Sequence, residues 1–388
     1  MTPAPSVEPR NDGELPAAAW LVALAGLPGM GPARLGALLE CWGAREGWQR
    51  VLDGRLDLAR LAARLPGRLD RTLPARWQCH ARSVEVAARW SAHLDADVRV
   101  VPRGDEPGLP HPLEDDHEAP AVLFVRGSPA VLDRPRVAVV GTRRCTHAGR
   151  ATARELGHDL AGAGVCVVSG LAQGIDGEAH RGALDARGGA APAAVVGSGL
   201  DVVYPRGNAE LWARVAGAGC VMSEYPLGTP PAPWRFPARN RIIAALADVV
   251  VVVESRETGG SMHTVDAALE RDRPVMVVPG PVRSPASAGT NDLLVAGSAA
   301  VRDAADVLAV LGLDAAASGR GRPDTRPSPT PAGAAVLDAL GWEPATLEMV
   351  AGRCRQSLGA VATEMAALER DGWVGRQGSW FERRADHR

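Results

Sequence analysis

The 388-residue sequence contains no lysine, and its other shortages exclude several classes of protein. All 43 basic side chains are therefore arginine, which keeps its charge at any working pH and binds phosphate through two nitrogens. The 6 cysteines are scattered, without a CxxC pair or a Cys/His cluster, so neither a disulfide framework nor a zinc site is expected. The 45 acidic residues nearly balance the arginines. Nucleic-acid binding through the field of the whole protein is thereby excluded, and only local clusters remain available for it.

Long apolar runs are missing as well. The valine run at residues 249–253 has the length of a strand and not of a membrane span. The polar N-terminus has no apolar core of the kind found in signal peptides. We therefore expect a cytoplasmic protein with reduced cysteines and no membrane contact. The 46% of hydrophobic residues is enough for a sizeable core, and the length predicts two or three domains.

Residues 14–97 are predicted to form a helical N-terminal domain, after a tail at 1–13 that we expect to be disordered. Apolar residues recur at three- and four-residue spacing through this region, which indicates amphipathic helices. Residues 27–32 (LPGMGP) precede such a helix and have the form of a helix-hairpin-helix or SAM-like turn. Amides at the start of that helix would bind a DNA phosphate without reading sequence. An ordinary packing hairpin explains the same residues, so both interpretations remain open.

Residues 98–312 are predicted to form an α/β core. Short valine-rich runs alternate there with amphipathic stretches, which indicates a parallel sheet covered on both faces. The fold class is an extended Rossmann-like, doubly wound, mostly parallel sheet, whose ligands bind beyond the carboxyl ends of the strands. The predicted strands are 98–101, 121–125, 137–140, 165–169, 193–197, 220–223, 249–254, 275–278 and 299–302. The predicted helices include 150–163, 176–186, 208–218, 239–247, 261–271 and 303–311.

Two further segments follow the core. Residues 313–332 are rich in proline, glycine and serine and are predicted to be a linker. Residues 333–388 contain three amphipathic segments and two short strands, which outlines a winged helix. Whether that domain contacts DNA or protein stays open, because a fold alone does not give a function.

Four loops of the core are polar or glycine-rich, and each follows a predicted strand. Because the carboxyl ends of parallel strands meet at one edge, we expect these loops to form an anion-lined groove. Phosphates would then lie on the amides of residues 141–143 and 260–261. The four loops are 141–144, 169–176, 197–206 and 258–261.

Asp176 and His180 have the spacing of an acid–base pair on a helix. The favoured interpretation is an N-cap aspartate and a helix-packing histidine, because no activated nucleophile accompanies them. The nucleotide fingerprints are also incomplete. Residues 197–199 (GSG) lack the third glycine of a dinucleotide loop, and a chain without lysine cannot complete a Walker A loop. No cofactor is expected.

Residues 234–241 (WRFPARNR) are the most basic local cluster. Arginines interleaved with Trp and Phe are typical of proteins that bind single-stranded nucleic acid, where cations follow the backbone and aromatic rings stack on bases. The alternative is a solvated helix start whose arginines pair with Glu224 or Glu254.

Five motifs occur in the order and at the spacing of one known family. They are GTR from Gly141, SGLAQGIDGEAHRGAL from Ser169, GLDVVYPRGN from Gly199, FPARNRIIAAL from Phe236, and VVPG followed by GTNDLL. Through them the chain resembles the DNA-processing protein A family (DprA, also called Smf). The resemblance implies a homodimer, formed through the Rossmann-like core, that binds single-stranded DNA without sequence preference. It also implies that the protein loads the RecA recombinase during natural transformation and is not an enzyme.

The resemblance also implies a set of site residues. The sequence departs from the family near Ala148, where a tyrosine is usual, and at Met262-His263, where Leu-Ile is commonest. The implied single-stranded DNA site consists of Gly141, Thr142, Arg143, Arg206, Arg239, Asn240, Arg241, Gly260 and Ser261.

A nucleotide hydrolase is the alternative function. The lysine-decarboxylase-like phosphoribohydrolases have a related fold and the signature Pro-Gly-Gly-x-Gly-Thr, with a catalytic Glu three residues later. Residues 258–263 (TGGSMH) lack the second Gly-Thr pair, and Asp266 stands at the position of the Glu. Both the phosphate cradle and the acid are therefore altered.

Overall fold

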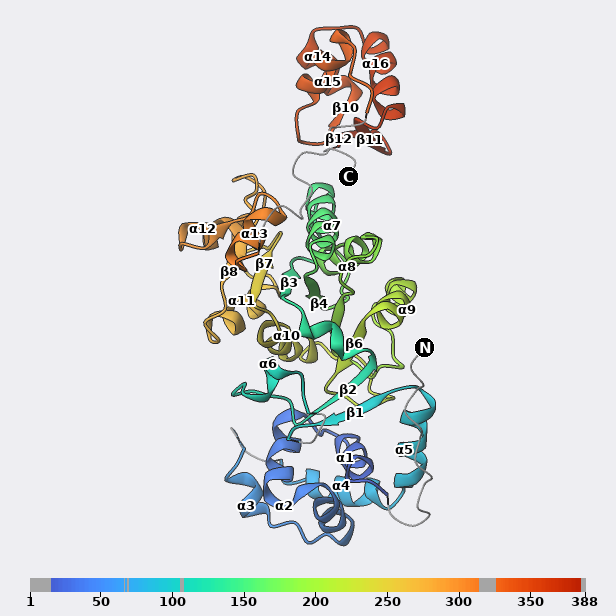
Figure 1. The fold of residues 1–388 in the computed structure, drawn as a ribbon, viewed down its shortest axis with the longest axis vertical. Coiled ribbons are helices and arrows are strands. Elements are labelled where there is room, and N and C mark those ends of the chain that lie inside the picture. Colours follow the sequence, from blue (N-terminus) through green and yellow to red (C-terminus); the bar gives the residue numbers. More distant parts are fainter. Residues whose placement is uncertain (1–14, 66, 68–69, 105–107, 314–325, 385–388) are drawn as a thin grey trace. The chain divides into compact units, whose positions relative to one another are not determined.

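The computed structural model describes residues 15–65, 67, 70–104, 108–313 and 326–384 (Figure 1). The predicted tail at 1–13 and most of the predicted linker lie outside the described residues. The chain forms two compact units, residues 1–318 and 319–388. None of the helices in the described part is long and apolar enough to cross a lipid bilayer.

Helices form the N-terminal part of the first unit. The indole nitrogen of Trp77 donates to the carbonyl of Pro28 at 2.9 Å and so fixes the turn that precedes the second helix. That helix is kinked at Gly43. The helices are α1 (Ala17–Ala25), α2 (Pro32–Asp53), α3 (Leu58–Ala62), α4 (Leu73–Ala81) and α5 (Val86–Asp95).

A nine-stranded sheet with the order β1-β2-β6-β5-β4-β3-β7-β8-β9 forms the centre of the first unit (Figure 1). Every pairing from β6 to β9 is parallel, and only β1 and β2 join antiparallel. The prediction of a mostly parallel sheet is therefore confirmed. The strands are β1 (Arg99–Pro102), β2 (Val122–Gly127), β3 (Arg136–Val140), β4 (Cys166–Ser169), β5 (Ala193–Val196), β6 (Cys220–Ser223), β7 (Val249–Val252), β8 (Val275–Val277) and β9 (Ala299–Ala300).

The helices of the core cover both faces of this sheet, which is why β7 consists of four buried valines. The largest differences from the sequence prediction are at α6, a four-residue helix that was not predicted, and at α10 and α12. α10 begins at Arg235 instead of residue 239, because the first turn of a helix tolerates Pro237. α12 was not predicted, since its buried residues are Gly289 and Thr290 and give no hydrophobic periodicity. The helices are α6 (His111–Glu114), α7 (His147–Gly162), α8 (Ile175–Asp185), α9 (Ala209–Ala218), α10 (Arg235–Leu246), α11 (Met262–Leu269), α12 (Ala288–Val295) and α13 (Ala304–Val310).

The N-terminal helices and the sheet share one apolar core. Leu24 and Leu38 belong to the same buried cluster as Phe124 of β2 and Val196 of β5. In addition, Nε2 of His93 on α5 accepts a hydrogen bond from the amide of Leu227 at 3.2 Å. The helical region is therefore packed firmly against the core.

The second unit is the predicted winged helix. Its three-stranded sheet has the order β10-β12-β11. Along the chain, β10 lies between α14 and α15, and β11 and β12 follow α16. Hydroxyl groups cap the helices, as when the Gly333 amide donates to Oγ1 of Thr330 at 2.9 Å. The elements are α14 (Pro331–Leu340), β10 (Ala345–Thr346), α15 (Leu347–Cys354), α16 (Leu358–Arg370), β11 (Val374–Gln377) and β12 (Trp380–Arg383).

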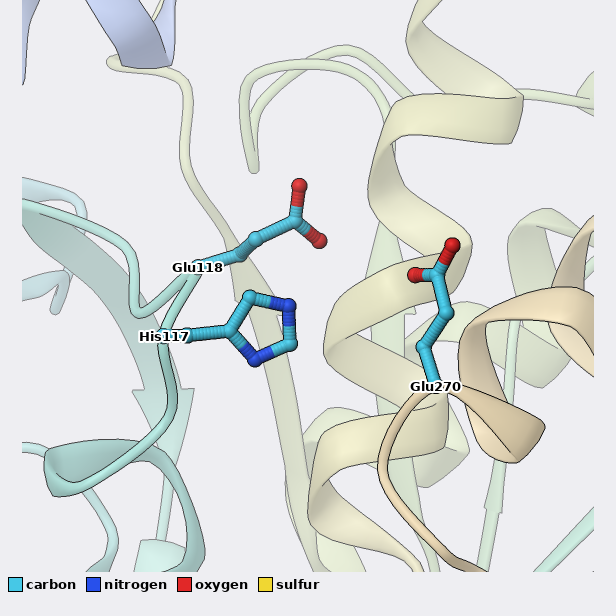
Figure 2. Close-up of side chains that lie close together, drawn as sticks. All are labelled: His117, Glu118 and Glu270. Carbon is cyan, nitrogen blue, oxygen red and sulfur yellow. The ribbon is translucent and has the colours of Figure 1, made fainter.

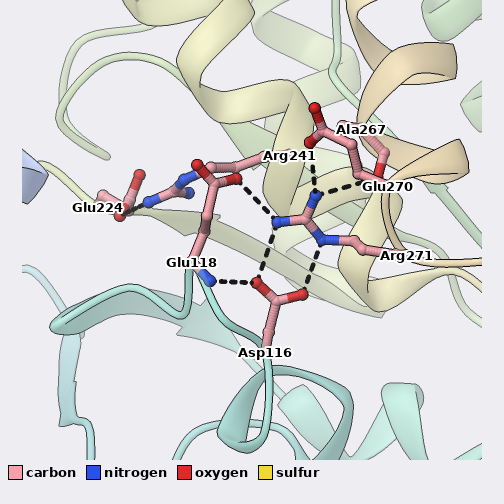
Figure 3. Close-up of polar contacts among 7 residues, drawn as sticks. All are labelled: Asp116, Glu118, Glu224, Arg241, Ala267, Glu270 and Arg271. Atoms are coloured by element: carbon pink, nitrogen blue, oxygen red, sulfur yellow. Dashed lines mark hydrogen bonds and ion pairs between the residues drawn. The ribbon is translucent and has the colours of Figure 1, made fainter.

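A buried ion pair joins the segment before β2 to the turn after α11 (Figure 3). Nε of Arg271 lies 2.7 Å from Oδ2 of Asp116, and their side chains are only 4% and 7% exposed. The amide of Glu118 also donates to Asp116, at 2.8 Å. Burial alone would raise the pKa of Asp116, but the hydrogen bonds from Arg271 and from the Glu118 amide hold that pKa below its ordinary value.

Asp116→Asn should lower the unfolding free energy at pH 7 by about 3 kcal/mol, because Arg271 is left as a buried and undercompensated charge. Because the pKa of Asp116 is lowered in the folded protein, the ion pair stabilises the fold at pH values above about 4, the ordinary pKa of a carboxylate. This stabilisation is lost as the pH falls through the pKa that Asp116 has in the folded protein. Urea unfolding of both proteins from pH 7 to pH 3 measures this. A stability difference that stays constant over that range would contradict the assignment.

Candidate nucleic-acid interface

The strand order places four loops at one edge of the sheet. β5, β4, β3 and β7 are parallel neighbours, so the loops that follow them leave the sheet on the same side. The prediction that the four loops share an edge is confirmed. From β3 the chain first adds β4, β5 and β6 on one side of that strand and then adds β7, β8 and β9 on its other side. α/β folds bind ligands at such a switch point, where the direction of strand addition reverses.

Two adjoining hollows lie at this edge and share Arg143, Ala172, Phe236 and Arg239 in their walls. One also includes Gln173 from the loop after β4, together with Tyr204 and Pro205 from the loop after β5. Six of the nine residues predicted for the site line the hollows, namely Gly141, Arg143, Arg239, Asn240, Gly260 and Ser261.

Arg143 is the exposed cation of the hollows. Its guanidinium carbon lies 4.7 Å from the centre of the Phe236 ring, and the ring of Tyr204 lies 5.3 Å from that of Phe236. A cation and two aromatic rings therefore border the same space, which suits a ligand with both a phosphate and a planar base.

The sequence suggested that Arg239 is an exposed phosphate ligand, but in the structure its position is different. Its side chain is buried, with 5% of the residue exposed, and Nη1 donates to the carbonyl of Val195 on β5. Burial lowers the pKa of Arg239 to about 10, and the nearby Asp176 opposes that change. A Cβ at position 170 would lie 1.8 Å from Nη1 of Arg239, so any larger residue there would displace this guanidinium. Arg239 thus forms the floor of the hollows and holds three segments together.

Asp176 does not cap α8, as the sequence suggested. The cap position is Gly174, which has a φ of 81° and packs so closely on the Thr142 carbonyl that a Cβ would lie 2.4 Å from it. The carboxylate of Asp176 instead accepts a hydrogen bond from the Gly170 amide at 3.1 Å, and burial raises its pKa. His180 is fully buried and its pKa falls to about 4 through burial, which agrees with a packing histidine and not with an acid–base catalyst.

Within the loop after β3, the amide of Thr142 is not available to a phosphate, as the sequence had suggested it would be. The amide of Thr142 donates to the carbonyl of Glu254 at 2.8 Å, so it is already used. The carboxylate of Glu254 accepts hydrogen bonds from the amide and hydroxyl of Thr146, the N-cap residue of α7. A buried carboxylate of the chain itself therefore occupies the helix start at which dinucleotide-binding folds hold pyrophosphate.

The loop after β7 is held from α10. Nδ2 of Asn240 donates to the carbonyl of Gly260 at 3.2 Å, and the hydroxyls of Ser261 and Ser255 are hydrogen-bonded at 2.8 Å. Within the described residues, no hydrogen bond is donated by the amides of Gly260 or Ser261. These two amides precede α11, so this loop retains main-chain donors for an anion.

Thr142, Arg206 and Arg241 lie outside the walls of the hollows. Nη2 of Arg241 is paired with the buried carboxylate of Glu224 at 2.6 Å (Figure 3), as the alternative interpretation of the basic cluster had it. Arg206 is exposed and directly follows Pro205, which does line a hollow. Arg206 is therefore near the rim, while Arg241 serves the packing of α10.

Three residues that shape this edge are not among the site residues predicted from the sequence. Phe236 and Tyr204 belong to quoted motifs but were not counted as site residues, although an aromatic ring beside a glycine-rich loop is a usable signal. The role of Glu254 could be suspected only from its place directly after a buried strand. Its partner Thr146 is 108 residues away in the sequence, so no local pattern joins the two.

One group of possible metal ligands exists among the described residues. Ligand atoms of the exposed His117, Glu118 and Glu270 lie within 4.8 Å of one another (Figure 2). However, Arg271 donates to Glu118 at 2.9 Å and lies 3.8 Å from Glu270. Because this arginine already supplies positive charge to both carboxylates, the group is poorly suited to a dication.

The geometry gives the hydrolase alternative little support. Asp266, at the position of that family's catalytic glutamate, is exposed on α11 and is absent from the walls of both hollows. No described residue of the hollows forms the nucleophile–base pair that covalent catalysis needs.

Comparison with known proteins gives concordant results. Residues 101–312 match the family model described as DNA recombination-mediator protein A, and residues 320–378 match the DprA winged helix domain. Protein Smf of Escherichia coli is 36% identical over 300 residues, which cover 76% of this chain and 79% of that protein. DNA processing protein DprA of Streptococcus pneumoniae is 38% identical over 220 residues, covering 56% and 77%. The X-ray structure of DNA processing protein A from Streptococcus pneumoniae aligns with a TM-score of 0.60 at 32% identity, covering 76% of this chain and 98% of that one.

Glu254→Ala should lower the unfolding free energy by about 1–3 kcal/mol, because the amide and hydroxyl of Thr146 lose their buried acceptor. Thermal unfolding measures the change. Glu257→Ala, which truncates an exposed carboxylate of the same loop, is the matched control and should change stability by less than about 0.5 kcal/mol. Equal effects of the two substitutions would contradict the capping role.

Proposed function

Since the chain belongs to the DNA recombination-mediator protein A family, we propose that it binds single-stranded DNA without sequence preference at the hollows formed by the loops after β3, β4, β5 and β7. The observation that carries the proposal is Arg143 stacked on Phe236 at the switch point of the sheet. Base stacking on an aromatic ring tolerates any sequence, because every base has a flat face.

The charge distribution supports a confined DNA site. The formal net charge is -2, so attraction to DNA has to come from local cations. Arg143 and Arg206 are exposed near the hollows, and the amides of Gly260 and Ser261 add donors at the start of α11. The proposed phosphate ligands are therefore these groups. Arg239 and Asn240 shape the site, and Arg241 stabilises the helix that carries them.

We further propose that the protein loads the RecA recombinase onto single-stranded DNA during natural transformation, and that it acts in the cytoplasm as a homodimer formed through the Rossmann-like core. Family membership supports this role, as does the match of both the core and the winged helix to family models. The proposed protein is a mediator and not an enzyme, and it needs no cofactor.

Fluorescence anisotropy with labelled single- and double-stranded oligonucleotides of matched length tests the binding. We expect tighter binding of the single strand, little dependence on base sequence and weaker binding as salt rises. No binding to either oligonucleotide at low salt would overturn the proposal.

Arg143→Ala should weaken single-strand binding and reduce the slope of log K against log salt by about 0.7, the value for one phosphate on a single strand. Arg187→Ala is the control, because it removes an exposed arginine just beyond the C-terminal end of α8, whose N-terminal end borders the hollows. The control should leave the salt slope unchanged. An unchanged slope in Arg143→Ala would remove Arg143 from the phosphate contacts.

A further inference from the structure

Trp234 is an exposed aromatic residue immediately beside the hollows. It occupies the N-cap position of α10, two residues before Phe236, and 53% of its surface is exposed. Most of the other tryptophans of the first unit are packed into its core, as Trp48 and Trp77 illustrate with 3% and 0% exposure. An exposed indole ring beside a candidate binding site presents a flat face on which a base can stack.

The ring is held in a fixed position although it is exposed. The guanidinium of Arg235 lies 4.6 Å from the ring centre of Tyr225 and 5.0 Å from that of Trp234. The rings of Tyr225 and Trp234 meet edge to face, with centres 6.2 Å apart and an interplanar angle of 83°. Arg235 is itself anchored, since its Nη1 donates to the carbonyl of Pro230. A preorganised ring loses little freedom when a base stacks on it.

The same ring borders the turn of the N-terminal hairpin. A Cβ at Gly31 would lie 3.9 Å from Cη2 of Trp234, so the two residues are in van der Waals contact range. Gly31 is the N-cap of α2, whose first amides point out of the turn. The exposed ring thus lies between the hollows and a helix start that attracts anions.

We propose that Trp234 is a second base-stacking platform and that the DNA strand leaves the hollows over this ring toward the turn formed by residues 29–31. This inference rests on the proposed function. Trp234 is two residues from Phe236, and the Arg235 guanidinium lies beside its ring. A cation next to a flat ring suits a nucleic acid, in which a phosphate lies next to each base, better than it suits an apolar protein segment. The N-terminal hairpin is then part of the binding surface.

Substitution of the ring tests the platform. Trp234→Ala should weaken binding of a 20-nucleotide single strand roughly tenfold, as expected for the loss of one stacked base. Trp234→Phe keeps a flat ring and should restore most of the affinity. On an oligonucleotide of the same length made of abasic sites, Trp234→Ala and the unsubstituted protein should bind alike, because no base is present to stack.

A pair of substitutions at Gly31 tests the path of the strand. Its backbone is extended (φ -132°, ψ 172°), so either side chain is tolerated, and both Asp and Asn are favourable N-caps. Gly31→Asp should bind the single strand several-fold more weakly than Gly31→Asn at low salt, and this difference should shrink as salt rises. Thermal unfolding of both variants checks that the comparison is not one of stability.

The outcomes separate the two proposals. If the unsubstituted protein binds no single strand, the proposed function fails. If it binds, but Trp234→Ala has the same affinity for base-containing DNA, the platform is overturned while the proposed function stands. Equal salt curves for Gly31→Asp and Gly31→Asn would overturn the path over the hairpin turn.

Discussion

The buried guanidinium of Arg239 is the interaction on which the edge formed by the loops after β3, β4, β5 and β7 depends. It extends from α10 under the loop after β4 and donates to the carbonyl of Val195 on β5. A guanidinium enclosed in this way needs nearby negative charge, which Asp176 supplies from the first turn of α8. It also needs space, which explains glycine at position 170. The hollows exist because this arginine fixes three segments at one place.

A second interaction within the chain places a carboxylate at the helix start where dinucleotide-binding folds hold a pyrophosphate. Glu254 takes the hydrogen-bond donors at the start of α7, and its carbonyl takes the Thr142 amide. Negative charge is therefore already present where a pyrophosphate would lie in a dinucleotide-binding fold. Attraction for a ligand phosphate then has to come from side chains such as Arg143 and from the loop that precedes α11. The Phe236 ring on α10 completes the surface that we propose for a DNA strand.

Much of this could be predicted from the sequence, and the successes have a common cause. Continuous valine runs such as β7 are required wherever a parallel strand is covered on both faces, so they appear in the sequence itself. The shared edge of the four loops followed from the same argument. The errors concern α12 and the roles of Asp176, Arg239 and Thr142. For the three residues the deciding contact is with another segment: Gly170 for Asp176, Val195 for Arg239 and Glu254 for Thr142.

The sequence by itself determined the fold class, the family and the neighbourhood of the site, because periodicity and motif spacing are local properties that the chain carries before it folds. The tertiary structure alone decided which arginines face solvent. Arg143, Arg239 and Arg241 have the same side chain, yet one stacks on Phe236 at the surface, one is buried beneath Gly170 and one pairs with Glu224. Burial and pairing depend on residues far away in the chain, and these are what separate a cation that is available to a phosphate from one that holds the protein together.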